Sequence, residues 1–439
     1  SGGLMILGNQ KTFRVALGLA STAILFSSCG GGNDPASLNS FIANSTPTPT
    51  PTSLAAPSVP ACVGESWQTI ATSPLAARDE AGIFWTGTDF LIYGGVYWGV
   101  SKFNDGARYN PTTDTWTMIS SVGAPSADRW DASYAYGNNE LFVFGGNGAG
   151  GGNTGGLYHI KTDSQAESWT ASSTTNAPTP RAYHVSYFHN SKFYIFGGND
   201  TTNSLMPIVG GGGKIYDPAA NSWTSIASGP TVGSYFASAS NDSNLFVFGG
   251  TSSQIPWAGN TTQNGLSTVS NSGAIYDYAH DTWKIISTVN APTARRSARA
   301  IAVGSKFVVW GGWSDNEDNT FNTGGIYDPS TDTWTSMSTA GAPPGGPATA
   351  MIYTGKRVVV WGIDNNPLSS INQGVNIGGI FNADTNNWET LTTALNAPAY
   401  HGYQGQSYSL WNGSEMLIWS GGYPAVNAGS IYTPPCGAK

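Results

Sequence analysis

The chain has 439 residues, of which 39% are hydrophobic and only 10% are charged, and its formal net charge is −8. This acidic balance argues against a nucleic-acid partner, which requires a basic face, and against an electrostatic membrane patch. The chain holds 57 glycines without a triplet period, which excludes a collagen-like protein. Aromatic residues among Gly-, Asn-, Ser- and Thr-rich connections favour short twisted strands joined by turns.

The N-terminal segment has the form of an export signal. Lys11 and Arg14 precede an apolar run over 15–26, which is too short to span a membrane comfortably. The residues that end in Cys29 resemble a bacterial lipobox, and this resemblance implies that the cysteine becomes the lipidated first residue. We expect residues 1–28 to be a signal peptide and Cys29 to be the only membrane anchor. The alternative is an ordinary signal peptide followed by an incidental cysteine.

Residues 29–61 are expected to form a flexible Gly/Thr/Pro-rich tether. Glycines at 30–32 give flexibility, and alternating Thr and Pro over 46–52 keep the chain extended because proline fixes φ and lacks an N–H donor. The tether would hold a globular body, residues 62–439, away from a membrane.

From residue 62 onward the chain repeats one pattern about every 50 residues. An apolar strand ends in a glycine pair, a polar loop of variable length follows, a second strand ends in an aromatic residue, and an acid or amide stands two residues before a Trp. The pairs begin at Gly94, Gly145, Gly197, Gly249, Gly311 and Gly421, with a degraded copy at Gly362, and the tryptophans are Trp67, Trp116, Trp169, Trp223, Trp283, Trp334 and Trp388. This period and strand content predict the four-stranded blades of a β-propeller.

A glycine pair after an apolar strand, then Tyr-Asp-Pro, then Trp closely resembles the Kelch repeat, as in the central domain of galactose-oxidase-like proteins. The resemblance covers roughly residues 62–436 and implies an all-β, seven-bladed propeller. The departures are local: Tyr158-His159-Ile160 replaces Tyr-Asp-Pro in repeat 2, and repeat 6 lacks the second glycine.

The ends of the repeat array predict how the ring closes. The last glycine pair, at Gly421, has no Trp after it, whereas Trp67 has no glycine pair before it. We therefore expect the strand around Trp67 to be the fourth strand of the seventh blade. Cys62 and Cys436 flank the two segments that this closure joins, so we expect a disulfide between them, as suits an exported protein. Two free thiols are the alternative.

Four arginines recur at one position of the repeat, 16 residues before the glycine pair: Arg78, Arg129, Arg181 and Arg295. Because an antiparallel blade alternates ends, this position and the loop after the glycine pair share one face. The arginines either satisfy backbone carbonyls or contact an anionic ligand, since guanidinium groups suit carboxylates. Loop aromatics on this face either stack on sugars or fold back onto the blades: Trp98, Trp257, Trp313 and Tyr423.

Signals for catalysis are weak. The five histidines show no metal-ligand spacing, and we expect neither a metal nor a cofactor. Kelch-type copper oxidases need a cysteine cross-linked to a tyrosine, whereas Cys62 and Cys436 are placed for closure. Tyr400 and His401, where the seventh repeat departs from the pattern, are the best candidates for chemistry.

These features together favour a monomeric binding or adhesion module of the bacterial cell envelope, an outer-membrane or surface lipoprotein that engages protein or glycan through its loop face. The alternatives are an exported carbohydrate-active enzyme, such as a sugar-acid mutarotase or epimerase, and a scaffold in an envelope complex.

Overall fold

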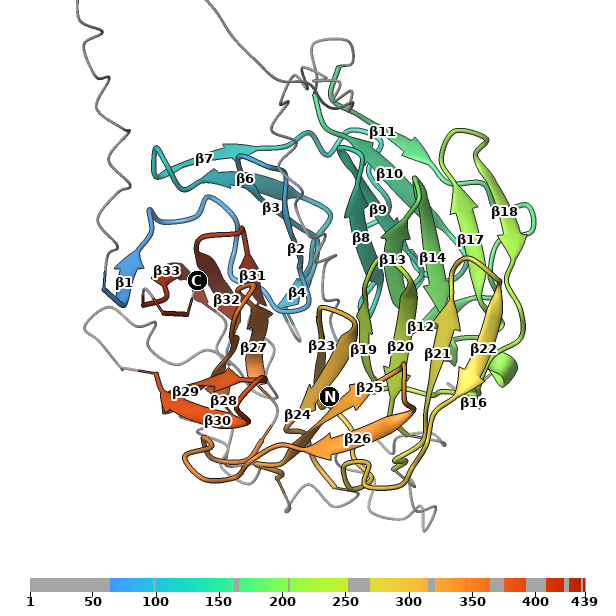
Figure 1. Ribbon diagram of the computed structural model, residues 1–439. Helices are drawn as coiled ribbons and strands as arrows, with labels where there is room; N and C mark the ends of the chain where they lie inside the picture. The colour runs from blue at the N-terminus through green and yellow to red at the C-terminus, as the bar shows by residue number, and fades with distance from the viewer. Residues whose placement is uncertain are drawn as a thin grey trace, which may run out of the picture. The chain divides into compact units, whose positions relative to one another are not determined.

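The computed structural model describes residues 64–97, 100–161, 166–203, 206–251, 269–314, 320–346, 348–363, 375–391, 408–421, 426–435 and 437–438. Their strands form seven antiparallel sheets of four strands, arranged as the blades of a ring (Figure 1). In the described part the only helical element is a short 3-10 turn, η1 (Val209–Gly212). None of the described residues forms a helix that is long and apolar enough to cross a membrane.

Each blade runs from an innermost first strand to an outermost fourth strand. The first three blades are β2 (Gly82–Trp85), β3 (Phe90–Tyr93), β6 (Gly106–Asn110) and β7 (Thr115–Met118); β8 (Ser133–Gly137), β9 (Glu140–Phe144), β10 (Gly155–His159) and β11 (Ser168–Ala171); and β13 (Val185–His189), β14 (Lys192–Phe196), β17 (Lys214–Asp217) and β18 (Ser222–Ser225). Blades 4 and 5 are β19 (Ala237–Ser240), β20 (Asn244–Phe248), β21 (Gly273–Asp277) and β22 (Thr282–Ile285); and β23 (Arg299–Val303), β24 (Lys306–Trp310), β25 (Gly324–Asp328) and β26 (Thr333–Ser336).

The last two blades complete the ring. Blade 6 is β27 (Ala348–Tyr353), β28 (Val358–Ile363), β29 (Val375–Asn382) and β30 (Asn387–Thr390), and blade 7 is β31 (Tyr408–Trp411), β32 (Met416–Gly421), β33 (Val426–Thr433) and β1 (Ser66–Thr69). Small ladders lie in the loops: β4 (Val96–Tyr97) with β5 (Ser101–Lys102), and β12 (Arg181–Ala182) with β15 (Asn199–Asp200) and β16 (Met206–Pro207).

The second strand of each blade is the apolar centre of its sheet. In β9 the residues Leu141–Phe144 are fully buried, because both faces of the sheet are covered by neighbouring blades. Phe142 stacks on Phe193 of the next blade at 4.9 Å between ring centroids, and Phe246 stacks on Phe307 at 4.8 Å. The core is therefore a series of layers between blades, which is why each second strand is a continuous apolar run.

The ring closes as the sequence predicts. Strand β1 pairs antiparallel with β33, with Ser66 opposite Thr433 and Trp67 opposite Tyr432. The Tyr432 hydroxyl donates to Glu65 Oε1 at 2.8 Å, so the two ends of the array also share a side-chain bond. Cys62 and Cys436 lie outside the described residues, and their disulfide stays a prediction.

Six of the repeated tryptophans take part in what we call the outer belt. In each belt unit, an acid or amide and the Trp two residues after it both bond to the backbone of one residue in the preceding blade. Asp114 Oδ1 accepts the backbone N–H of Ala71 at 2.7 Å, and Trp116 Nε1 donates to the Ala71 carbonyl at 2.9 Å. The same pair of bonds, 2.6 to 3.2 Å long, holds Ser120 to Glu167 and Trp169, Ser173 to Asn221 and Trp223, Ala227 to Asp281 and Trp283, Ser287 to Asp332 and Trp334, and Ser338 to Asn386 and Trp388. Six junctions between blades are thus fastened in one way.

Candidate functional site

The candidate site lies at the end of the blades where the second strands finish in a glycine pair, which we call the Gly-Gly face. Gly145 and Gly146 show why glycine is needed there. A Cβ on Gly145 would lie 2.6 Å from the Arg181 carbonyl oxygen of the next blade, and one on Gly146 would lie 2.8 Å from the Trp130 carbonyl oxygen. Both residues also have positive φ, +66° and +99°. The pair lets the entering strands of two blades approach closely.

The four repeated arginines are buried beneath this face. Their exposed fractions are 0% for Arg78, 5% for Arg129, and 1% for both Arg181 and Arg295. In every case an Nη1 group donates to the carbonyl of the first glycine of the pair, at 2.9 to 3.2 Å. In every case Nε donates to a carbonyl two or three residues earlier. The guanidinium groups thus tie the start of the first strand to the end of the second.

Further contacts hold individual arginines. Arg78 forms an ion pair with Asp105 at 2.6 Å, and its guanidinium lies 3.9 Å from the centre of the Phe103 ring. Phe321 covers Arg295 at 4.4 Å. Burial lowers the pKa of Arg181 and of Arg295 to about 10, so both stay charged at neutral pH. This geometry matches the carbonyl-satisfying role; ligand contact by these arginines stays a prediction.

Most of the candidate loop residues cannot be placed in the structure. Trp98, Trp257, Tyr423, Tyr400 and His401 lie outside the described residues. Trp313 is only 2% exposed, and the Arg296 guanidinium lies 5.1 Å from its ring. Trp313 is therefore folded against the blade, as one of the two sequence-based alternatives has it.

Sequence reasoning missed an inner collar, which we define as the residues two positions after the arginine register. They are Glu80, Asp131, Tyr183, Tyr235 and Ser297, with φ of 59°, 54°, 60°, 61° and 54°. In each blade the residue just before them is bonded to the residue after the glycine pair, as Asp79 is to Val96 and Trp130 is to Asn147. The left-handed residue then redirects the chain into the first strand. Non-glycine residues rarely adopt this conformation, and five at one register mark a shared constraint of the fold.

Collar residues of neighbouring blades are joined at seams. Between blades 2 and 3, Tyr183 N donates to the Asp131 carbonyl at 3.2 Å, and between blades 4 and 5, Ser297 N donates to the Tyr235 carbonyl at 2.8 Å. Between blades 1 and 2 the acceptor is different, because Asp131 N donates to the side chain of Glu80, at Oε2, over 2.9 Å. A carboxyl group thus takes the place of a backbone carbonyl at this seam.

The collar carries a buried acidic group at blades 1 and 2. Asp79, Glu80 and Asp131 are each at most 5% exposed. Burial raises the pKa of Asp79 to about 7 and that of Asp131 to about 6, and burial together with the Asp131 charge raises the pKa of Glu80 well above its usual range. Asn147 Nδ2 donates to Asp131 Oδ2 at 3.2 Å. No ion pair joins these three carboxyls to a basic group within the described part of the chain.

His184, in contrast, lies in the layer between blades 2 and 3. Its Nε2 is 2.6 Å from the Ser133 hydroxyl, which also contacts Ser186. The histidine is 1% exposed, and burial lowers its pKa well below the usual value, with the nearby Arg181 charge acting in the same direction. A neutral, enclosed imidazole of this kind fits a structural role.

Apolar side chains are exposed on the same side of the molecule. The large apolar side chains that are exposed in the described part are those of Val100, Met118, Val122, Ile285 and Val289, with exposed fractions of 46 to 83%. Val100 follows the glycine pair of blade 1, Met118 and Ile285 end fourth strands, and Val122 and Val289 follow those ends. Fourth strands end at the Gly-Gly face, where Ile119 N bonds to the Gly106 carbonyl at the start of β6. All five therefore lie on the Gly-Gly face or at its outer edge.

The described residues contain no group of three or more His, Cys, Asp or Glu side chains arranged to hold a metal ion.

A family model for the KLHDC2/KLHL20/DRC7 Kelch-repeats domain matches residues 80–256 and 215–422. The chain belongs to this Kelch-repeat family. Propellers of this family are typically protein-interaction modules.

Several curated proteins resemble the chain over part of their length. Beta-scruin of Limulus polyphemus is 26% identical over 243 residues, which are 52% of this chain and 24% of the relative. Alpha-scruin of the same organism is 23% identical over 48% of this chain and 22% of its own length. Ras guanine nucleotide exchange factor F of Dictyostelium discoideum is 30% identical over 36% of this chain and 13% of its own length. The alignments thus span a quarter or less of these relatives.

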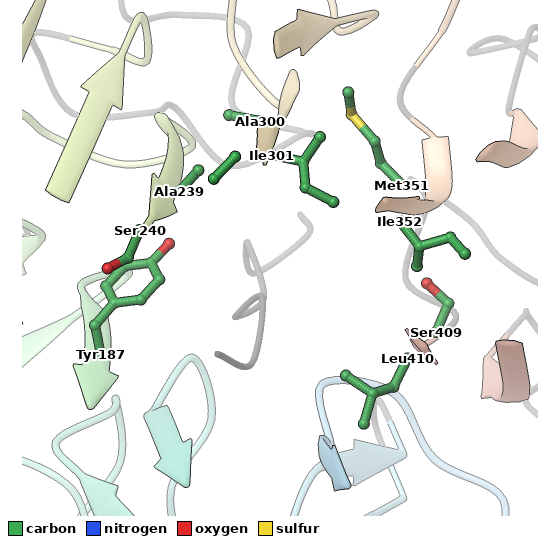
Figure 2. A pocket seen from close by; sticks show the side chains of 10 residues that line it. Tyr187, Ala239, Ser240, Ala300, Ile301, Met351, Ile352, Ser409 and Leu410 are labelled. Carbon is green, nitrogen blue, oxygen red and sulfur yellow. The ribbon is translucent and has the colours of Figure 1, made fainter. Parts of the chain in front are cut away.

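The axis of the Kelch propeller has a hollow lined by the first strands of five blades. Figure 2 shows Tyr187, Ala239, Ser240, Ile301, Met351, Ile352 and Leu410 around this space. The Tyr187 hydroxyl is bonded to Ser238 and the Ser240 hydroxyl to Tyr278, each at 2.8 Å. The lining of this hollow is mostly apolar, and these two hydroxyls already have partners.

Proposed function

We propose that this Kelch propeller is a binding module that engages a protein partner through its Gly-Gly face. The observation that carries the proposal is the distribution of exposed apolar side chains. Val100, Met118, Val122, Ile285 and Val289 lie on one side of the ring, where the loops also vary most in length. The residues fall into two groups, three at blade 1 and two at blade 4, and exposed apolar patches mark interaction sites.

The chemistry of the described face favours a protein over an anionic sugar. The repeated arginines, which would suit a sugar acid, already donate to carbonyls of their own blade. The side chains buried at the collar of blades 1 and 2 are carboxyls, which offer an anion no positive charge. Most of the loop aromatics that glycan binding would use, and the His401 that a mutarotase or epimerase would use, lie outside the described residues.

We also propose an exported, envelope-bound location for the module. The lipobox-like end at Cys29 and the Thr-Pro tether support a lipid anchor that holds the propeller away from an outer membrane. A disulfide from Cys62 to Cys436 would fasten the sequence flanks of the paired strands β1 and β33. Mass spectrometry of the mature N-terminus and of non-reduced peptides tests these two modifications separately.

Site-specific photo-crosslinking in the producing cell tests the binding face. A photoreactive phenylalanine derivative replaces Val100 or Val122, and the matched control replaces Thr112, which lies in the turn between β6 and β7 at the opposite end of the blade. We expect a discrete protein adduct from positions 100 and 122 and none from 112. An equally strong adduct from 112, or none from either valine position, would contradict the proposal.

A further inference from the structure

The seam between blades 1 and 2 differs in one chemical respect from the seams between blades 2 and 3 and between blades 4 and 5. Its cross-blade bond, from Asp131 N to Glu80 Oε2 at 2.9 Å, ends on a group that can ionise. The equivalent bonds at the seams between blades 2 and 3 and between blades 4 and 5 end on backbone carbonyls, which cannot. The strength of this bond therefore depends on a protonation state, whereas that of the two backbone bonds does not.

We propose that the Glu80 and Asp131 carboxyls share one proton, and that loss of this proton opens the collar between blades 1 and 2. The two side chains come from adjacent blades and are 3% and 5% exposed. With one proton present, one carboxyl donates to the other and both backbones stay in contact. When neither carboxyl carries a proton, the two negative charges lie close together in a site that excludes water, and they repel each other.

Among the described residues, no basic side chain forms an ion pair with either carboxyl. The other titratable or charged side chains around it are Asp79, Tyr134, Tyr183, Tyr235, Arg78, Arg129 and Arg296. Asp79 adds further negative charge, and burial keeps the three tyrosines protonated by raising their pKa values. Arg78 and Arg129 donate to Gly94 and Gly145, and Arg296 lies against Tyr235 and Trp313.

The direction of the pH effect follows from the sign of the shifts. Burial raises the pKa of both carboxyls above their values in an unfolded chain, and the Asp131 charge raises that of Glu80 further. The closed seam therefore binds a proton more tightly than the open seam does. Its stability is complete at acid pH and is lost as pH rises through the titration of the folded pair, by up to about tenfold in the opening equilibrium per pH unit.

Hydrogen exchange read by mass spectrometry tests the proposal, with the seam between blades 4 and 5 as an internal control. The full chain is compared at pH 6 and pH 8, and rates are corrected for intrinsic base-catalysed exchange. We expect protection of peptides that contain Asp131 to fall at least tenfold, while protection of peptides that contain Ser297 stays within twofold. Equal behaviour of the two seams would overturn the proposal.

Two substitutions sharpen the test. Glu80→Gln keeps an acceptor for Asp131 N and adds a permanent donor, so it mimics the protonated pair and should abolish the pH dependence at this seam. Asp131→Asn should act alike, because asparagine accepts the left-handed conformation that Asp131 has. If the seam of both variants still opens as pH rises, the shared proton is not the cause. Opening of this seam by loss of the proton needs no binding partner, so its test is independent of the proposed function.

Discussion

The outer belt and the inner collar are both repeated around the ring, but they repeat different things. The belt repeats side chains: an acid or amide and a Trp hold the same backbone position of the preceding blade at six junctions. The collar repeats a backbone conformation, with φ between 54° and 61°, and fills it with glutamate, aspartate, two tyrosines and serine.

This difference separates the parts of the propeller that hold it together from the parts that distinguish one blade from the next. A belt position must supply a given donor or acceptor, so its residue type is constrained. A collar position must supply only a left-handed turn, so its side chain is available for other tasks. The collar is therefore where one shared backbone turn carries side chains that differ from blade to blade.

The largest effect is expected at the belt. Trp223 is 5% exposed, and its Nε1 donates to the Ser173 carbonyl at 2.7 Å. Trp223→Ala should lower the free energy of unfolding by about 3–5 kcal/mol, because it removes buried surface between two blades. Urea denaturation measures this loss. Trp223→Phe retains an aromatic ring but loses the hydrogen bond to Ser173, so its unfolding free energy should fall by less. A loss below about 1 kcal/mol for Trp223→Ala would contradict the view that the belt holds the blades together.

The next effect tests whether the arginines belong with the scaffold. Arg181→Ala removes the Nη1 donor of the Gly197 carbonyl, at 3.2 Å, and one of the two donors of the Gly211 carbonyl, at 3.3 Å, and it should cost about 2–4 kcal/mol. Arg181→Lys should recover part of the loss, since an ammonium group reaches fewer acceptors. Thermal and urea unfolding of both variants provide the measurement. A fully stable Arg181→Ala protein would instead place this arginine among the residues kept for ligand contact.

A smaller effect is expected where the collar backbone itself is tested. Ser297 has φ of 54° and donates its N–H to Tyr235. Ser297→Val should cost about 1–2 kcal/mol because a β-branched side chain is strained in the left-handed region. Ser297→Gly should be neutral or more stable by up to about 1 kcal/mol. If both variants have the stability of the wild type, the collar conformation is not a constraint of the fold.

The smallest effect is a pair of opposite pH dependences. Burial lowers the pKa of His184, so its contribution to stability is present above the usual histidine pKa and is lost as pH falls below it. The collar carboxyls, whose pKa values are raised, lose theirs as pH rises. Each group adds a slope of at most about 1.4 kcal/mol per pH unit. His184→Gln should flatten only the acid limb of a stability–pH curve and Glu80→Gln only the alkaline limb; the reverse pattern would exchange the two assignments.

Much of the belt could be predicted from the sequence, because its function depends on residue type. Trp67 without a glycine pair before it, and the pair at Gly421 without a Trp after it, together predict the closure that the pairing of β1 with β33 confirms. Tyr158 pairs with Trp169 in the usual register, so the irregular Tyr158-His159-Ile160 segment leaves blade 2 intact.

The collar could not be predicted in the same way, because Glu80, Tyr183 and Ser297 have no side-chain property in common. The only signal was their constant offset of two residues from the arginine register, and a backbone angle does not appear in residue identities. Nor does the sequence reveal that Asp131 reaches Glu80, since their contact depends on how two blades meet.

The most direct test of the central claim is the affinity of the cross-linked partner for surface variants of the full chain, measured by calorimetry or surface plasmon resonance. Val100→Arg and Val122→Arg alter the Gly-Gly face, and Thr112→Arg alters the opposite face with the same added charge. We predict that each valine variant weakens binding at least tenfold and that Thr112→Arg changes it by less than twofold. Equal loss in all three variants, or loss in Thr112→Arg alone, would contradict a binding site on the Gly-Gly face.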